Sequence, residues 1–223
     1  MKTWVISDTH GWHKSLQVPE GIDTIIHAGD STNAFNLYTN IPEFHDFKIW
    51  LFDLPVKNKV LIAGNHDAWA TKRYNIDDLK SQNVIYLEHE AAIVEGKTIF
   101  GSPYTPTFGN WHFMKDRAKL SRYWEILGTN IDILITHGPP KGILDLTENR
   151  DYTLEQVGDG ALYKKVIKVK PTYHIFGHVH DVKQCRNAGI LQRDGITFIN
   201  AAVVEDGKFE QGPINNGHII NIL

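Results

Sequence analysis

Residues 60–67 read Val-Leu-Ile-Ala-Gly-Asn-His-Asp and join two very different kinds of sequence. The first half is a short, continuous apolar run, as expected of a strand that is buried on both faces. The second half places an amide, an imidazole and a carboxylate directly after a glycine, which permits a sharp turn. This stretch therefore predicts a buried strand that carries metal-binding side chains at its C-terminal end.

The same arrangement occurs at four other places in the chain. Apolar runs at residues 3–6, 24–27, 131–136 and 173–176 each lead into a short polar cluster. These clusters are Asp8-Thr9-His10, Gly29-Asp30, His137-Gly138 and Gly177-His178-Val179-His180. In folds of this kind, ligands bind beyond the C-terminal ends of the strands. All five clusters are therefore expected to contribute to one site.

The remaining segments indicate a sandwich of mixed sheets with flanking helices, of α/β or α+β type. Helices are predicted at about residues 36–53, 67–81, 116–127 and 160–170. Pro171 would end the last of them, because proline cannot continue a helix. Shorter strand-like segments occur without intervening helices at residues 84–87, 92–94, 98–100, 185–191, 197–200 and 218–222.

The side chains in the five clusters form a mixed nitrogen and oxygen set. Asp8 and His10 lie two residues apart, so in an extended chain both can reach one ion. Asp30 has two carboxylate oxygens and can bridge two cations, while Asn65 offers an amide oxygen. The nitrogen donors are His137, His178 and His180. Such a set suits Mn, Fe, Zn, Ni or Co, and it disfavours Ca, which prefers oxygen ligands.

Each cluster alone also has a simpler interpretation. An isolated Asp-x-His is more often a surface pair, and an isolated Gly-Asp is a turn. Gly64-Asn65-His66-Asp67 could merely begin a helix, with Asn65 or Asp67 as the capping residue. The metal interpretation depends on five such clusters at five strand ends.

Length and composition limit the function further. The 223 residues are 42% hydrophobic and 22% charged, and they are expected to form a single domain spanning residues 1–223. A net charge of -3 does not suggest stable nucleic-acid binding. We expect no membrane span and no cleaved leader, because the first strand begins at once. The single Cys185 is consistent with a reducing, cytoplasmic setting.

The ordered set Asp-x-His, Gly-Asp, Gly-Asn-His-Asp, Thr-His and Gly-His-x-His resembles the calcineurin-like metallophosphoesterases over residues 8–200. A narrower resemblance is to the metallophosphoesterase-domain-containing, or brain-239-like, group. It is carried by residues 101–104, Trp111 and residues 136–140, 176–180 and 194–201. That group is associated with phosphodiesterase activity on cyclic nucleotides and model diesters.

This resemblance implies a four-layer α/β/β/α sandwich of two mixed sheets flanked by helices. It implies two divalent metal ions, with Mn as the first expectation and Fe, Zn, Ni or Co as alternatives. The ligands of the first ion would be Asp8, His10 and His180, and those of the second Asn65, His137 and His178. Asp30 would bridge the two ions. His66 would not be a ligand but would protonate the leaving group, and Asp67 would orient His66 or the loop.

The implied reaction is hydrolysis of a small, nucleotide-like phosphodiester by a hydroxide that bridges the two ions. A phosphomonoesterase could use the same centre, and an interaction scaffold on this fold is a further alternative. The sequence does not determine the oligomeric state. Four aromatic residues of one loop could stack on a base or cover the core: Tyr104, Phe108, Trp111 and Phe113.

Several other polar residues are open to two interpretations. Arg117, Arg122 and Arg150 could contact phosphate or simply carry surface charge, and Arg150 is preferred because it follows the His137 loop. His13 is either a substrate contact or exposed. His27 is expected in the core.

Overall fold

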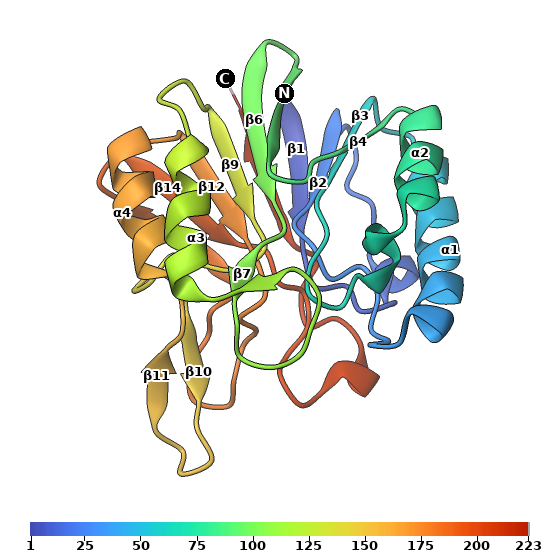
Figure 1. Ribbon diagram of the computed structural model, residues 1–223. Helices are drawn as coiled ribbons and strands as arrows, with labels where there is room; N and C mark the ends of the chain where they lie inside the picture. The colour runs from blue at the N-terminus through green and yellow to red at the C-terminus, as the bar shows by residue number, and fades with distance from the viewer. Residues whose placement is uncertain (223) are drawn as a thin grey trace.

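The computed structural model describes residues 1–222 and places two mixed sheets face to face between two pairs of helices (Figure 1). The first sheet has the strand order β15-β1-β2-β3-β4. Its strands are β1 Lys2–Ile6, β2 Thr24–His27, β3 Asn58–Leu61, β4 Val84–Tyr86 and β15 His218–Asn221. β1 to β4 are parallel, and β15 is antiparallel to β1.

The second sheet has the strand order β13-β14-β12-β9-β6-β5. Its strands are β5 Glu90–Val94, β6 Lys97–Ser102, β9 Ile133–Thr136, β12 Tyr173–Phe176, β13 Gly189–Arg193 and β14 Ile196–Asn200. The four central strands are parallel, and the edge strands β5 and β13 are antiparallel to their neighbours. Both sheets are therefore mixed, as the sequence predicted.

The helices cover the outer faces of the two sheets. They are α1 Leu37–Asp53, α2 Arg73–Ser81, α3 Arg117–Tyr123 and α4 Gly160–Val169. Short 3-10 turns lie at His13–Ser15, Ala68–Thr71, Trp124–Ile126 and Phe209–Gln211. In Figure 1, α1 and α2 flank one sheet while α3 and α4 flank the other. This gives the predicted α/β/β/α order.

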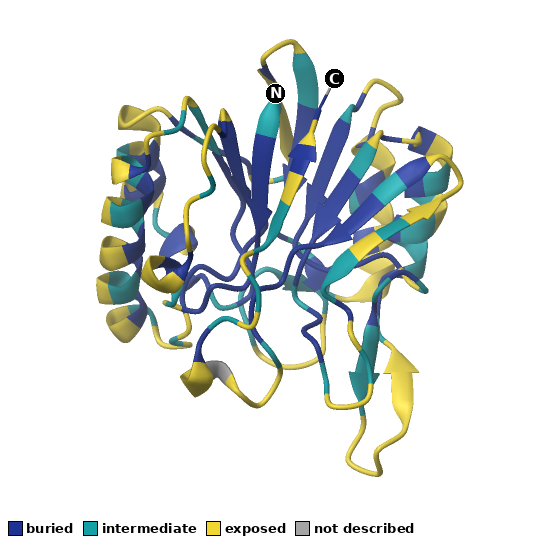
Figure 2. Cartoon of the chain, turned by 180° about the vertical axis from the view of Figure 1, so that it is seen from behind, coloured by how far each residue is buried: buried dark blue, intermediate teal, exposed yellow. Residues whose placement is uncertain are grey.

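Neighbouring residues of one strand explain the layering. The side chains of Trp4 and Ile6 pack against helix α1. Val5, the residue that separates them in the sequence, packs between the two sheets. Phe176 and Phe198 belong to a third cluster, with Leu162 of α4. Because successive strand residues point to opposite faces, a strand covered on both faces is expected to be mostly apolar. Figure 2 shows these strands buried and the outward faces of the helices exposed.

Three predicted elements have bounds that differ from the prediction. The predicted helix 67–81 begins as the 3-10 turn Ala68–Thr71, and α2 itself starts only at Arg73. The predicted helix 116–127 is instead α3, Arg117–Tyr123, followed by a 3-10 turn at Trp124–Ile126. The strand predicted at 185–191 is shifted to Gly189–Arg193. α4 ends at Val169, where Lys170 takes a left-handed conformation just before Pro171.

A hairpin that the sequence did not predict extends beyond the sheets on the side where the parallel strands end (Figure 1). It consists of β10 Leu146–Glu148 and β11 Leu154–Gln156, paired antiparallel. A small parallel pair, β7 Thr105–Pro106 and β8 Met114–Lys115, brackets the loop 107–113 nearby. These two features border the site described below.

Candidate metal centre

Five loops bring the candidate ligands together at the C-terminal edge of both sheets. Asp8 follows β1 by two residues, Asp30 follows β2 and Asn65 follows β3. His137 and His178 follow β9 and β12 of the other sheet. The candidate centre therefore lies between the two sheets, with candidate ligands from each of them.

Four residues of these loops have a left-handed backbone conformation. Asp8, Asp30 and His178 have φ values of 55°, 55° and 69°, and His10 has a φ of 43°. A positive φ is uncommon for residues with a side chain, and such strain concentrates at functional sites. The conformation turns these four side chains toward one another.

Two glycines leave room for the carboxylates. A Cβ at Gly177 would lie 2.0 Å from Asp8 Oδ2, and one at Gly64 would lie 2.2 Å from Asp30 Oδ1. Both distances are far shorter than a van der Waals contact, so no other residue fits without displacing the carboxylate. The glycines in these motifs thus leave space for two carboxylates among the candidate ligands.

The first group of candidate ligands is Asp8, His10 and His180, whose ligand atoms lie within 4.8 Å of one another. His180 Nε2 is 3.0 Å from Asp8 Oδ1. The backbone N–H of His178 also donates to Asp8, at 3.0 Å from Oδ2. Asp8 is fully buried, so its carboxylate is held in place from two sides.

The second group is Asp30, His137 and His178, again within 4.8 Å. His137 Nδ1 lies 3.0 Å from the carbonyl oxygen of Ala28, to which it donates. This leaves Nε2 facing Asp30 Oδ2 at 3.3 Å and Asn65 Oδ1 at 3.0 Å. Three electron-pair donors therefore converge: an imidazole nitrogen, a carboxylate oxygen and an amide oxygen. Such donors need a cation or a proton between them, so this set fits a metal ion.

Asp30 lies between the two groups. Its Oδ2 is 3.3 Å from His137 Nε2 and 3.9 Å from His10 Nε2. Its other oxygen, Oδ1, accepts a hydrogen bond of 2.7 Å from the backbone N–H of His66. One carboxylate thus adjoins a histidine from each candidate position.

The electrostatics match this arrangement. Burial lowers the pKa of His10 and of His178 to about 3, which keeps both rings neutral and able to bind a metal. Burial also opposes a charge on His137, but the adjacent Asp30 outweighs it and raises the pKa of His137 to about 9. Burial disfavours the charge on Asp30 as well, yet His137 and His66 keep its pKa well below the usual value.

His66 lines the cavity next to the candidate ligands. Its ring lies in the cavity wall, and its Nδ1 is 2.8 Å from the carbonyl oxygen of Asn33. Its ligand atom is also within 4.8 Å of those of His10 and Asp30. The Trp111 ring lies over it, with a centroid distance of 4.1 Å.

Asp67 contacts the loops and not the ring of His66. Its Oδ1 accepts hydrogen bonds from the hydroxyls of Ser31 and Thr32 at 2.7 Å and 2.8 Å. The Trp69 indole donates to the same oxygen at 3.0 Å, and the Gly64 N–H donates to Oδ2 at 2.8 Å. Of the two predicted roles for Asp67, these contacts favour orientation of the loop.

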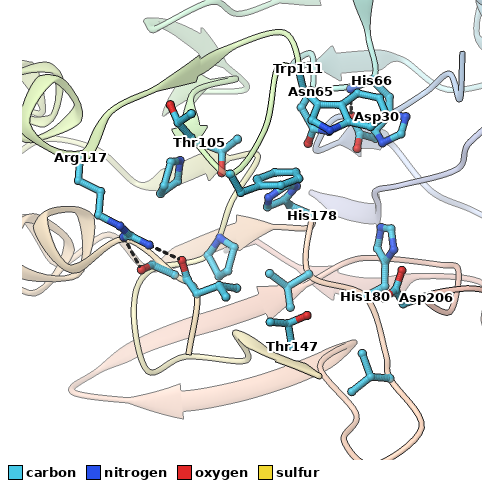
Figure 3. A pocket seen from close by; sticks show the side chains of 18 residues that line it. Asp30, Asn65, His66, Thr105, Trp111, Arg117, Thr147, His178, His180 and Asp206 are labelled. Atoms are coloured by element: carbon cyan, nitrogen blue, oxygen red, sulfur yellow. Dashed lines mark hydrogen bonds between the residues drawn. The ribbon is translucent and has the colours of Figure 1, made fainter. Parts of the chain in front are cut away.

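A cavity of about 550 Å³ opens beside the centre (Figure 3). Metal-ligand candidates and His66 form one end (Figure 3), and apolar residues make up much of the lining. Those apolar residues are Pro106, Phe108, Trp111, Pro139, Val157, Val179 and Val182. The cavity lining also includes Thr105, Thr147 and Asp206, which carry no motif and which the sequence therefore did not reveal.

The aromatic and arginine candidates from the sequence differ in whether they line the cavity. Phe108 and Trp111 line the cavity, whereas Tyr104 and Phe113 pack against hydrophobic clusters. Arg117 lines the cavity, but the preferred Arg150 is exposed and outside that lining.

The two histidines near the first loops are both structural. His13 is buried, with Nε2 3.2 Å from Asp46 Oδ2, so it is neither exposed nor part of the cavity lining. His27 is buried in the core as expected, with Nε2 3.0 Å from the Thr9 hydroxyl.

The chain belongs to the calcineurin-like phosphoesterase family, whose model matches residues 1–182. Human metallophosphoesterase domain-containing protein 1 is 33% identical over 89% of this chain and 64% of the human protein. The chain thus spans less than two thirds of that relative. A UPF0046 protein of Caenorhabditis elegans is 35% identical over 93% of this chain and 71% of the worm protein.

The fold is also seen in a distant solved structure. The crystal structure of phosphopantetheinyl hydrolase from Mycobacterium tuberculosis matches with a TM-score of 0.61 at 16% identity, covering 98% of this chain and 95% of that chain. The candidate ligand groups are consistent with membership of this family. Within residues 1–222, the structure contains no helix long and apolar enough to cross a bilayer.

Proposed function

We propose that this protein is a metal-dependent phosphodiesterase that hydrolyses small, nucleotide-like diesters at a dinuclear centre. The main support is the position of Asp30, whose carboxylate adjoins His10 on one side and His137 on the other. Asp8, His10 and His180 would hold one ion, and Asn65, His137 and His178 the other. Asp30 would be shared, and Mn²⁺ is the first metal to test.

When bound, two divalent ions would supply a water of lowered pKa and stabilise charge on the phosphoryl oxygens. The chain itself has to bind and orient the diester and deliver a proton. His66 is placed to give a proton to the departing oxygen, a contribution typically of about 10²–10⁴-fold. Its Nδ1 is engaged with Asn33, so Nε2 is the nitrogen that would carry this proton.

The residues that line the cavity favour a diester over a monoester. A monoester has a second negative charge but no second substituent. Its recognition would therefore call for cationic side chains at the phosphate. Among the described lining residues the only Lys or Arg is Arg117, and its guanidinium donates to the carbonyls of Val157 and Gly158 at 2.9 Å each. The apolar wall instead offers a surface for a second ester substituent.

The aromatic part of the wall supports a nucleotide-like substituent. Phe108 is 61% exposed, and its ring lies 5.3 Å from that of His178. An accessible aromatic ring beside a phosphate site can stack on a base. A 2′,3′- or 3′,5′-cyclic nucleotide would place its base and its phosphodiester within one cavity of this size.

The test is a comparison of rates on bis-p-nitrophenyl phosphate, p-nitrophenyl phosphate and 2′,3′-cAMP, with Mn²⁺ and with EDTA. We expect EDTA-sensitive diester cleavage well above monoester cleavage, and loss of cleavage in Asp30→Asn. A preference for the monoester would favour a phosphomonoesterase. An unchanged rate in Asp30→Asn would contradict the mechanism, and no hydrolysis with any metal would favour an interaction scaffold.

We also propose that residues 1–223 act as one domain in a reducing, cytoplasmic setting. The ligands come from both sheets, so neither half of the sandwich holds a complete site. The single Cys185, which is not in a disulfide, is consistent with that setting. Expression of residues 1–223 alone would test the first point, because a single domain should unfold in one cooperative transition.

A further inference from the structure

We propose that Trp111 is a positioning residue that holds the imidazole of His66 in its working orientation. This inference rests on the proposed function, because it assigns a partner to the group that would protonate the leaving oxygen. Trp111 is not a metal-ligand candidate and lies in the loop 107–113, between β7 and β8. Figure 3 shows its indole next to His66 and Asn65 at the metal end of the cavity.

The His66 ring needs a second contact beyond its hydrogen bond. The bond from Nδ1 to the Asn33 carbonyl, at 2.8 Å, fixes which nitrogen faces inward. A single hydrogen bond still allows the ring to tilt about that axis. The Trp111 ring closes one face of the imidazole, with centroids 4.1 Å apart and an interplanar angle of 34°. His10 meets the ring of His66 edge-on, at 4.8 Å and 87°.

Trp111 is itself held by contacts to the same loops. Phe35 packs edge-on against its indole, with centroids 5.0 Å apart at 90°. The neighbouring His112 donates its backbone N–H to the carbonyl of Asn65 at 3.2 Å. The segment that carries Trp111 is therefore tied to the loop that carries Asn65 and His66. A shift of that segment would move the indole and the imidazole together.

An alternative role for Trp111 is direct contact with the substrate, since it also lines the cavity. The two roles predict different kinetics. A positioning residue acts through His66, so its loss matters most when the leaving group needs a proton. A residue that contacts the substrate directly affects all substrates that share the contacted group, whatever their leaving group. Phe108 provides the comparison, because it lines the same cavity but its ring lies against His178.

The experiment measures kcat and KM for methyl p-nitrophenyl phosphate and methyl phenyl phosphate with Mn²⁺. The two diesters differ in the basicity of the leaving oxygen, and the more basic phenolate needs the proton more. We expect Trp111→Ala to lower kcat on the phenyl ester roughly tenfold or more, a fraction of the full general-acid effect. On the p-nitrophenyl ester the loss should be smaller, and Trp111→Phe should recover much of the rate.

A double-mutant cycle completes the test. If Trp111 acts through His66, adding Trp111→Ala to His66→Ala should cause little further loss, because interacting residues are not additive. Phe108→Ala should raise KM to a similar extent for both esters. Equal losses on both esters in Trp111→Ala, or full additivity with His66→Ala, would overturn the inference.

Failure of this inference is distinguishable from failure of the proposed function. A large effect of His66→Ala with none from Trp111→Ala would leave the phosphodiesterase standing and remove the role of Trp111. No effect of His66→Ala on either ester would remove the general acid itself and the inference with it. Metal content, measured by mass spectrometry on each variant, should be unchanged in Trp111→Ala. A loss of metal there would also contradict the inference.

Discussion

His137 Nε2 lies 3.3 Å from Asp30 Oδ2, although the two residues follow strands of different sheets. The contact links the two sheets at the edge where their parallel strands end. It also raises the pKa of His137 to about 9 against the opposing effect of burial. A buried histidine held next to a buried carboxylate is a position that a divalent ion can take over from a proton.

The close approach of Gly177 to Asp8 predicts that a single methyl group disrupts the first ligand group. Gly177→Ala would place a Cβ 2.0 Å from Asp8 Oδ2, so the carboxylate would have to leave its place. We expect loss of metal at the Asp8 position and at least a tenfold drop in diester hydrolysis, since correct geometry is essential to catalysis. Metal analysis and rate measurement would check this.

Gly128→Ala is the matched control, because a Cβ at Gly128 would meet nothing within 4 Å. It should keep wild-type metal content and rate. Normal metal binding in Gly177→Ala would contradict the packing argument.

Asp67 is predicted to stabilise the site loops by accepting their hydrogen bonds. Asp67→Asn would replace one carboxylate oxygen with an NH₂ group, which at the Oδ2 position would face the backbone N–H donors of Gly64 and Ser31. Leaving buried donors without acceptors costs about 1–3 kcal/mol for each group. We expect the free energy of unfolding, measured with urea, to fall by roughly 2–4 kcal/mol.

Asp77→Asn is a suitable comparison because the Asp77 side chain is 57% exposed and pairs with the exposed Arg73 on α2. Its stability should stay within about 0.5 kcal/mol of the wild type. Equal effects of the two substitutions would show that the Asp67 network does not hold the loops.

His174 is predicted to make the fold sensitive to acid. Burial lowers the pKa of this core histidine from 6.5 to about 3, so the native state excludes a proton that the unfolded chain binds. The stabilisation is complete above pH 6.5 and is lost as the pH falls toward 3. The loss amounts to about 1.4 kcal/mol for each pH unit below the unfolded pKa.

The His174→Gln variant isolates this effect, because glutamine stays neutral and can still bond to the Thr136 hydroxyl. Urea unfolding at about pH 7 and pH 5 should show the wild type losing about 2 kcal/mol relative to the variant. The exposed His45→Gln controls for removal of a histidine. Parallel stability curves for His174→Gln and the wild type would contradict the assignment.

The parts of the fold that the sequence predicted correctly are those with an unambiguous physical signature. Runs such as residues 24–27 are apolar on both faces because each strand is covered by a helix layer and by the other sheet. The hairpin β10–β11 was missed because its second strand is exposed throughout and has no apolar alternation. The helix at 67–81 starts late because Asp67 is engaged with Ser31 and Thr32 and does not cap it.

The sequence indicated only some of the residues of the candidate site. Candidate ligands such as Asp8 and His137 could be proposed from motifs because few residue types bind transition metals. The contact of Trp111 with His66 depends on how a loop folds back across the sheet edge, and no local pattern encodes that. The same holds for Thr105 and Thr147, which line the cavity only because β7 and β10 border it.

The most direct test of the dinuclear centre is a calorimetric titration of metal-free protein with Mn²⁺. The account predicts that the wild type binds two ions per chain and that Asp30→Asn weakens both, because Asp30 is the proposed shared ligand. Binding of a single ion by the wild type, or an Asp30→Asn titration that matches the wild type, would contradict it.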